Sequence, residues 1–191
     1  MRACGAVTRL AIRPYPSELE EWVEHRGRRL LLRPIRPEDT PRHRQFLTKV
    51  APRDLYTRFF ASVRALPEAE LAHLTQIDYD REMAFVAVAR DAAGDEEIIG
   101  VVRACADPDN DAAEFAVLVR SDLKTHGLGT LLMRKLIRYC RERGTRALCG
   151  DVMCENTAML HLARSLGFCV RRTEQNVETV ALDLQVQPAE G

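Results

Sequence analysis

The sequence predicts a mixed α/β domain. Short apolar runs bounded by turn residues indicate strands, and longer segments with apolar residues at helical spacing indicate helices. In chain order these segments give a strand, helices, three strands, a helix, a strand, a helix and two strands. This order is typical of a mixed sheet with helices packed against it.

The first third of the chain combines a leader with one strand and three helices. Residues 1–29 carry prolines and many charges, so we interpret them as a leader or linker, with a helical stretch around 17–25. Leu30 begins a strand that ends at Pro34, because proline cannot donate to a strand ladder. Acidic residues favour a helix start after Pro37. Helices are expected at about 37–50, 53–61 and 67–75.

The middle of the chain predicts three strands. Residues 83–89 and 98–104 are apolar runs, and Gly94 lies in the turn expected between them. The segment 107–111, rich in Asp and Asn with one proline, is a strong turn signal. The next strand is expected at 113–119.

The last third begins with an amphipathic helix. Leu128, Leu132, Leu136 and Cys140 recur every four residues, and the helix is expected to end near Gly144. The basic residues of this segment are expected on its solvated face: Arg134, Lys135, Arg138 and Arg141. The remaining elements are a strand at 147–152, a helix at 155–166, and strands at 168–172 and 177–184.

Composition and charge give no reason to propose a nucleic acid or a membrane as partner. The chain has 191 residues, enough for one ordinary core, and its 46% hydrophobic and 29% charged residues are typical of globular proteins. Its 28 basic and 28 acidic residues cancel, so we expect no nucleic acid or membrane partner. No apolar run approaches the roughly 20 residues that a membrane helix needs.

The six cysteines show no metal or disulfide pattern. None forms a CxxC pair, and the spacing of His and Cys matches no zinc site, so we expect no metal. Apolar neighbours predict buried thiols in a reducing compartment, and the absence of a secretory h-region agrees with a cytoplasmic location. The cysteines are Cys4, Cys105, Cys140, Cys149, Cys154 and Cys169.

A glycine loop before the amphipathic helix predicts a phosphate site. The expected strand at 113–119 leads through a short turn into Gly127 and Gly129, where the helix begins. Such a loop directs several backbone N–H groups at one place, and the helix dipole adds positive potential there. This loop therefore suits a phosphate or pyrophosphate group.

Several interpretations compete for this loop. A P-loop needs a lysine after its last glycine, but Thr130 follows Gly129. A dinucleotide-binding loop needs a third glycine, where a leucine stands, although Asp151 lies about where a ribose-binding acid is expected. The [Q/R]xxGxG/A loop of GNAT acetyltransferases matches Gly127 and Gly129, with Lys124 in place of Gln or Arg. A glycine-rich turn without a ligand also satisfies the spacing.

Longer sequence segments favour the acetyltransferase interpretation. The stretch from about Leu30 to Leu184 resembles the GNAT fold, and most strongly the bacterial protein lysine acetyltransferases of the Pat type. The phrases that carry this resemblance are residues 31–39, 75–88, 107–110, 113–124 and 163–168.

The resemblance implies a domain organisation. It predicts a GNAT domain at 30–185, with a mostly antiparallel sheet that splays between the fourth and fifth predicted strands, and a tail at 186–191. Residues 1–29 resemble the linker that follows an acyl-CoA-synthetase-like domain in that family.

The resemblance also implies where acetyl-CoA binds. The backbone of the fourth predicted strand would hold the pantetheine arm, and an N–H near Val117 would polarise the thioester carbonyl. Asn156 matches a residue that touches the pantetheine in the family, although a helix N-cap is an equally good interpretation from the sequence. The full set of expected acetyl-CoA contacts is Val117, Leu118, Val119, Lys124, Thr125, His126, Gly127, Leu128, Gly129, Thr130, Asn156 and Met159.

Glu114 is the candidate catalytic base. A lysine ammonium, with a pKa of about 10.4, must lose a proton before it can attack a thioester. Glu114 lies at the start of the coenzyme strand among apolar residues, so we expect partial burial, and it matches the catalytic glutamate of the Pat-type enzymes. The alternative is a solvated glutamate at a strand end. Many GNAT enzymes use a tyrosine as general acid where this chain has Ala163, so that mechanism is not expected here.

These features predict an acetyl-CoA-dependent protein lysine N-acetyltransferase that works by direct attack in a ternary complex. The resemblance implies acyl-CoA synthetases among its protein partners. Asp78 and Asp80 form either a turn cluster or an acidic lip for a lysine-bearing substrate. Two other functions stay open: acetylation of a small amine, and a non-catalytic module that binds acyl-CoA.

Overall fold

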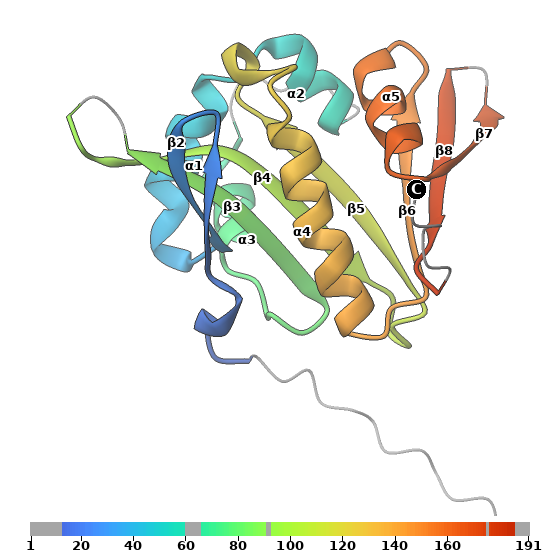
Figure 1. Ribbon diagram of the computed structural model, residues 1–191, viewed down its shortest axis with the longest axis horizontal. Coiled ribbons are helices and arrows are strands. Elements are labelled where there is room, and N and C mark those ends of the chain that lie inside the picture. Colours follow the sequence, from blue (N-terminus) through green and yellow to red (C-terminus); the bar gives the residue numbers. More distant parts are fainter. Residues whose placement is uncertain (1–12, 60–65, 91–92, 175, 186–191) are drawn as a thin grey trace, which may run out of the picture.

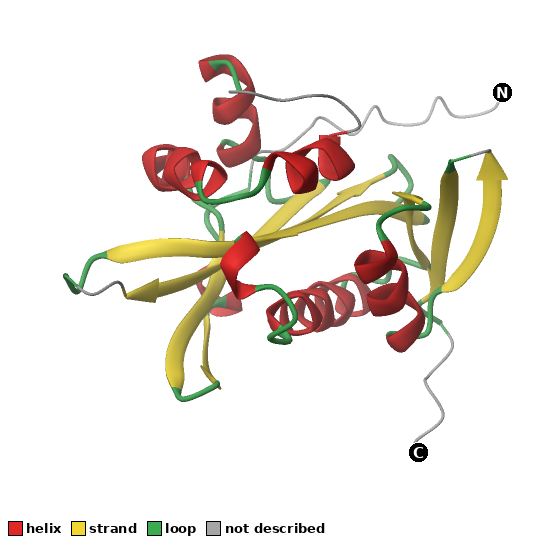
Figure 2. Ribbon diagram, turned by 90° about the horizontal axis from the view of Figure 1, so that it is seen from above, coloured by secondary structure: helices red, strands yellow, loops and turns green. Residues whose placement is uncertain are grey.

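An eight-stranded sheet with helices on both faces forms the body of the molecule (Figures 1 and 2). The computed structural model describes residues 13–59, 66–90, 93–174 and 176–185. The strands follow the order β1-β2-β3-β4-β5-β6-β8-β7, and every neighbouring pair is antiparallel except β5 and β6. The strands are β1 (Glu21–His25), β2 (Arg28–Pro34), β3 (Glu82–Arg90), β4 (Glu96–Ala106), β5 (Ala112–Val119), β6 (Ala147–Met153), β7 (Cys169–Glu174) and β8 (Val177–Asp183).

The helices form two layers. α4 crosses β3, β4 and β5 on one face of the sheet, whereas α1 and α2 contact β4 and β5 from the other (Figure 1). The apolar stripe predicted for α4 is buried, with Leu132 and Leu136 fully enclosed. No helix of the described segments is long and apolar enough to cross a membrane. The helices are α1 (Thr40–Thr48), α2 (Pro52–Phe59), α3 (Glu68–Thr75), α4 (Leu128–Glu142) and α5 (Thr157–Ser165), with 3-10 turns η1 (Ser17–Leu19), η2 (Pro37–Asp39) and η3 (Ser121–Leu123).

The helical stretch expected around 17–25 is wrong. After the short turn η1, the chain forms β1, which pairs with β2 along its whole length. Its residues are alternately half-buried and exposed, which is the period of a strand, and Val23 packs against the core. Pairing with β2 therefore outweighs local helix propensity, and part of the expected leader belongs to the sheet.

One basic residue that was expected on the solvated face of α4 is also buried. Lys135 donates to the carbonyl of Leu19 at 2.7 Å and to the Glu21 carboxylate at 2.9 Å. Arg138, one turn away, pairs with the same carboxylate. The solvated face expected for Lys135 is wrong because the N-terminal segment and β1 cover it.

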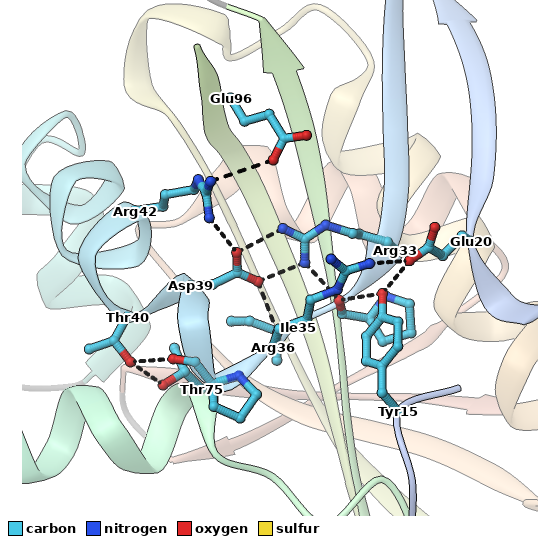
Figure 3. Close-up of polar contacts among 12 residues, drawn as sticks. Tyr15, Glu20, Arg33, Ile35, Arg36, Asp39, Thr40, Arg42, Thr75 and Glu96 are labelled. Carbon is cyan, nitrogen blue, oxygen red and sulfur yellow. Dashed lines mark hydrogen bonds and ion pairs between the residues drawn. The ribbon is translucent and has the colours of Figure 1, made fainter. Parts of the chain in front are cut away.

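A buried polar network joins β2 to the first helices (Figure 3). Arg33 forms two parallel hydrogen bonds to Asp39, at 2.6 and 2.7 Å, and both side chains are almost fully enclosed. Asp39 also accepts from the backbone N–H of Arg36 at 2.9 Å. The Arg36 guanidinium in turn pairs with Glu20, which accepts from the Tyr15 hydroxyl at 2.6 Å. The network fixes η2 and the segment before β1 against β2.

The expected splay of the sheet is confirmed. β5 and β6 are parallel neighbours but pair only over 112–114 and 147–149. β6 continues along β8 to its end, so within the described residues the rest of β5 has no partner on that side. At the point of separation, a Cβ on Gly150 would lie 3.2–3.3 Å from Phe115. Glycine therefore allows β6 to lie close to Phe115 of β5 at the point where the two strands diverge.

The cysteines differ from the expectation of buried thiols. Among the described residues only Cys140 is buried, and burial raises the pKa of its thiol to about 12. Cys105 and Cys169 are exposed, because their strand positions place them away from the core. Cys4 lies outside the described residues.

Candidate active site

A cleft of about 920 Å³ opens where β5 and β6 separate. It is bounded by β5, β6, the loop before α4, the start of α5 and one side of α2. Glu114 and eleven of the twelve expected coenzyme contacts line it. They are Val117, Leu118, Val119, Lys124, Thr125, Gly127, Leu128, Gly129, Thr130, Asn156 and Met159.

The loop before α4 has the features of an anion site. Gly127 is the N-cap of α4 with a φ of 83°, a conformation that favours glycine, and no side chain of the described residues caps the helix. The first turn of α4 contains no acidic residue. The first N–H groups of a helix have no partner within it, so those of Leu128, Gly129 and Thr130 are free to bind a ligand phosphate.

The neighbours of this loop hold it from two sides. The Lys124 ammonium pairs with Asp54 of α2, and the other oxygen of Asp54 accepts from the Ser121 hydroxyl at 2.6 Å. On the far side, Arg26 donates to the carbonyl of His126 at 3.1 Å. His126 is the one expected coenzyme contact that does not line the cleft. The turn between β1 and β2 thus supports the loop, a contact that the sequence did not predict.

The open edge of β5 provides the second binding surface. Val117, Leu118 and Val119 pair with β4 on one side, and in the described chain no strand covers their other side. Backbone N–H and C=O groups alternate along a strand edge, so this edge can form hydrogen bonds with an extended amide-bearing ligand.

Glu114 lies at the point of separation. It is the last β5 residue that pairs with β6, directly opposite Cys149, and on its other side it faces Cys105 of β4. Burial raises the pKa of the Cys149 thiol, and the Glu114 carboxylate raises it further. Glu114 itself is exposed to the cleft, so the expected partial burial is wrong. Strand alternation explains this, because Ala113 and Phe115 take the buried positions.

The start of α5 closes the cleft. Asn156 is the N-cap of α5 and accepts from the backbone N–H of Met159 at 3.2 Å, as the helix-cap interpretation predicted. Both residues also line the cleft. Ala163, at the position of the family's tyrosine, is completely buried and offers no acid.

Three cleft residues come from α2 and were not predicted. Asp54, Thr57 and Arg58 form one side of the cleft. The spacing of Asp54 and Arg58 places them on the same face of a helix, but it also fits a solvated pair, and no local signal distinguishes these cases. Burial lowers the pKa of the Arg58 guanidinium, Arg103 lowers it further, and Glu114 acts in the opposite direction.

The proposed acidic lip is not part of this cleft. Asp78 accepts from the backbone N–H groups of three following residues, and Asp80 pairs with Arg13 and Arg143. Neither residue lines the cleft, so the turn-cluster interpretation describes them. In the part of the chain that the structure describes, no three His, Cys, Asp or Glu side chains gather as metal ligands.

Comparison with known proteins identifies the family. Residues 50–168, more than half of the chain, match the model of the acetyltransferase (GNAT) family. The chain belongs to this family. Its uncapped helix N-terminus and open strand edge fit the acetyl-CoA that GNAT acetyltransferases use.

Individual relatives agree with this assignment. Acetyltransferase PA5475 of Pseudomonas aeruginosa is 36% identical over 157 residues, which cover 81% of this chain and 84% of that protein. The GNAT domain of S. lividans PAT has a TM-score of 0.80 and 27% identity, over 89% of this chain and 99% of that one. RimL, a ribosomal L7/L12 alpha-N-protein acetyltransferase solved with coenzyme A, shares the fold at 17% identity and a TM-score of 0.68, over 85% and 98% of the two chains.

Proposed function

We propose that this acetyltransferase transfers the acetyl group of acetyl-CoA to the ε-amine of protein lysines, by direct attack in a ternary complex. The position of Glu114 supports the proposal best. The carboxylate faces the cleft at the splay of the sheet, while the phosphate loop follows the far end of β5. The strand between Glu114 and Val119 spans about 17 Å, so a long coenzyme arm can reach from one to the other.

Different residues of the cleft bind different parts of the coenzyme. The first-turn N–H groups of α4, together with Lys124, bind the pyrophosphate of the coenzyme. Lys124 must then exchange its Asp54 partner for a phosphate. The open edge of β5 holds the pantetheine amides, and the N–H of Val117 polarises the thioester carbonyl.

Glu114 accepts the proton that the attacking ammonium must lose, directly or through one water. The amine nitrogen then forms a bond to the carbonyl carbon, the carbon–sulfur bond breaks, and the nitrogen releases its second proton to solvent. A thiol has a pKa of about 8.5, so the thiolate leaves readily and takes its proton from solvent. This assignment needs no protein acid at the position of Ala163.

Acetylation of a purified acyl-CoA synthetase tests the proposal. The synthetase is incubated with acetyl-CoA and the enzyme, free thiol is followed over time, and modified lysines are located by mass spectrometry. Acetyl-lysine that depends on the enzyme is the expected result. Binding of acetyl-CoA without transfer to this protein or to a panel of small amines would instead identify a binding module. Transfer only to small amines would show that the acceptor is a small amine and not a protein lysine.

A further inference from the structure

Arg58 occupies an unusual position in the cleft. It lies on the same face of α2 as Asp54, one turn further along, and it is half-buried. Arg58 lines both the main cleft and a small cavity of about 20 Å³, which His43 and Arg103 also line. Glu114 is close enough to influence the pKa of Arg58, yet no ion pair joins the two. Arg58 is therefore a cation in the same cleft as the proposed base.

Arg58 lacks the partner that comparable arginines of this chain have. Arg33 is paired with Asp39, Arg103 with Glu82 and Arg120 with Glu97. Within the described residues, the Arg58 guanidinium forms no hydrogen bond or ion pair, and only the ring of Phe59 lies near it, at 5.0 Å. The neighbouring sequence 60–65 contains no Asp or Glu that could supply a carboxylate.

An unpaired, half-buried cation favours the binding of an anion. Withdrawal from water costs free energy that a carboxylate partner offsets, and a guanidinium binds a carboxylate in a bidentate geometry. The nearby charge of Arg103 increases that preference. In the same cleft, the carboxylate of Glu114 suits the ammonium of the acceptor. The two side chains together complement a molecule that carries both an amine and a carboxylate.

We propose that Arg58 binds a carboxylate of the acceptor, so the preferred acceptor amine has an acidic group close to it. This inference rests on the proposed function for the place of the amine at Glu114. The carboxylate comes either from an acidic residue beside the target lysine of a protein or from the α-carboxylate of a free amino acid. Both sources present the same chemistry to Arg58.

Matched acceptor pairs distinguish the two sources. One pair consists of lysine peptides that differ only in a Glu or a Gln next to the lysine. The other pair is Nα-acetyl-lysine and its amide, in which only the ε-amine can react. Calorimetry measures the binding of each compound to the enzyme loaded with coenzyme A, and separate assays measure kcat/KM with acetyl-CoA.

The wild type is expected to bind the acidic member of at least one pair at least tenfold more tightly, and the Arg58→Gln variant to lose this preference. Arg58→Lys should retain part of it. Arg53→Gln, which removes an exposed charge from the same helix, should behave like the wild type. Unchanged affinity for acetyl-CoA shows that the variants are folded.

Two results would overturn the role of Arg58. In the first, the wild type does not bind the acidic acceptors, or binds them no more tightly than their neutral counterparts. In the second, the preference for the acidic acceptors survives in Arg58→Gln. These outcomes are separate from the test of acetyl transfer. If carboxylates bind through Arg58 but no acetyl-lysine forms, the role of Arg58 is supported and the proposed function is rejected. Acetylation of lysine with no preference for acidic acceptors would support the proposed function and reject the role of Arg58.

Discussion

Arg33 and Arg58 show two ways of removing a guanidinium from solvent. Arg33 is almost completely enclosed, with a bidentate carboxylate and a fixed place between β2 and η2 (Figure 3). Arg58 is half-buried at the side of an open cleft and has no carboxylate partner among the described residues. A closed pair contributes to one fixed structure, whereas an open cation retains its capacity for a ligand. Residue type alone would not separate the two.

The largest expected effect is the loss of activity when Glu114 in the cleft is replaced. Glu114→Gln removes the proton acceptor but keeps the shape of the side chain, so kcat should fall by about 10²–10⁴-fold. Thiol release from acetyl-CoA measures the rate. Glu142→Gln, at the exposed end of α4, is the matched control and should leave the rate unchanged. A Glu114→Gln variant with nearly full activity would remove Glu114 from the mechanism.

Breaking the closed pair should affect stability instead. Asp39→Asn leaves the Arg33 charge buried without its partner, and the free energy of unfolding should fall by about 3–5 kcal/mol. Urea unfolding gives this value. Glu68→Gln breaks the exposed pair with Arg44 and should cost less than about 1 kcal/mol. Equal losses in the two variants would mean that burial of the pair has no energetic consequence.

His43 should make stability depend on pH. Burial lowers its pKa to about 4, Arg103 adds to this effect, Asp39 opposes it, and Nδ1 has no hydrogen-bond partner among the described residues. Between about pH 6.5 and 4 the unfolded chain binds a proton that the folded chain does not. Acidification through this window should therefore lower the free energy of unfolding, by about 3 kcal/mol.

Urea unfolding across this pH range measures the effect, and His43→Phe provides the control. The substitution keeps an aromatic ring beside Phe46, whose ring centre lies 5.7 Å away, but removes the titrating group. The variant should lose most of the dependence between pH 6.5 and 4. An identical dependence in wild type and variant would assign the effect to other groups.

The smallest expected effect is the stability of Arg58→Gln. Because this charge has no partner among the described residues and lies near Arg103, its removal should change the free energy of unfolding by less than about 1 kcal/mol, or raise it. Arg103→Gln, which breaks the pair with Glu82 at 3.1 Å, should be clearly destabilising. A large loss in Arg58→Gln would show that Arg58 belongs with Arg33 as a structural residue.

Local patterns in the sequence predicted most of the fold. The apolar stripe of α4, the turn at 107–111 and the short apolar strands are periodic or local signals, and the structure has an element at each position. The failures occur where distant segments meet. β1 is a strand because β2 pairs with it, and Lys135 is buried because the segment before β1 covers it.

The candidate site was predicted in the same uneven way. Gly127 and Gly129 carry their own signal, since a glycine loop before an amphipathic helix is local, and both residues line the cleft. Their coenzyme contacts stay predictions, as does the role of Glu114. Arg58 carries no local signal, because the sequence around it is an ordinary polar helix.

The sequence by itself determined the order of the elements from Leu30 onward, the glycine loop and the family resemblance, because these depend on residues close together in the chain. Only the tertiary structure decided which side chains share the cleft. The splay of β5 from β6 exposes a strand edge, and the packing of α2 against β5 places Arg58 in the same cleft as Glu114. Both arise from contacts between segments far apart in the sequence, whose geometry depends on how whole layers pack.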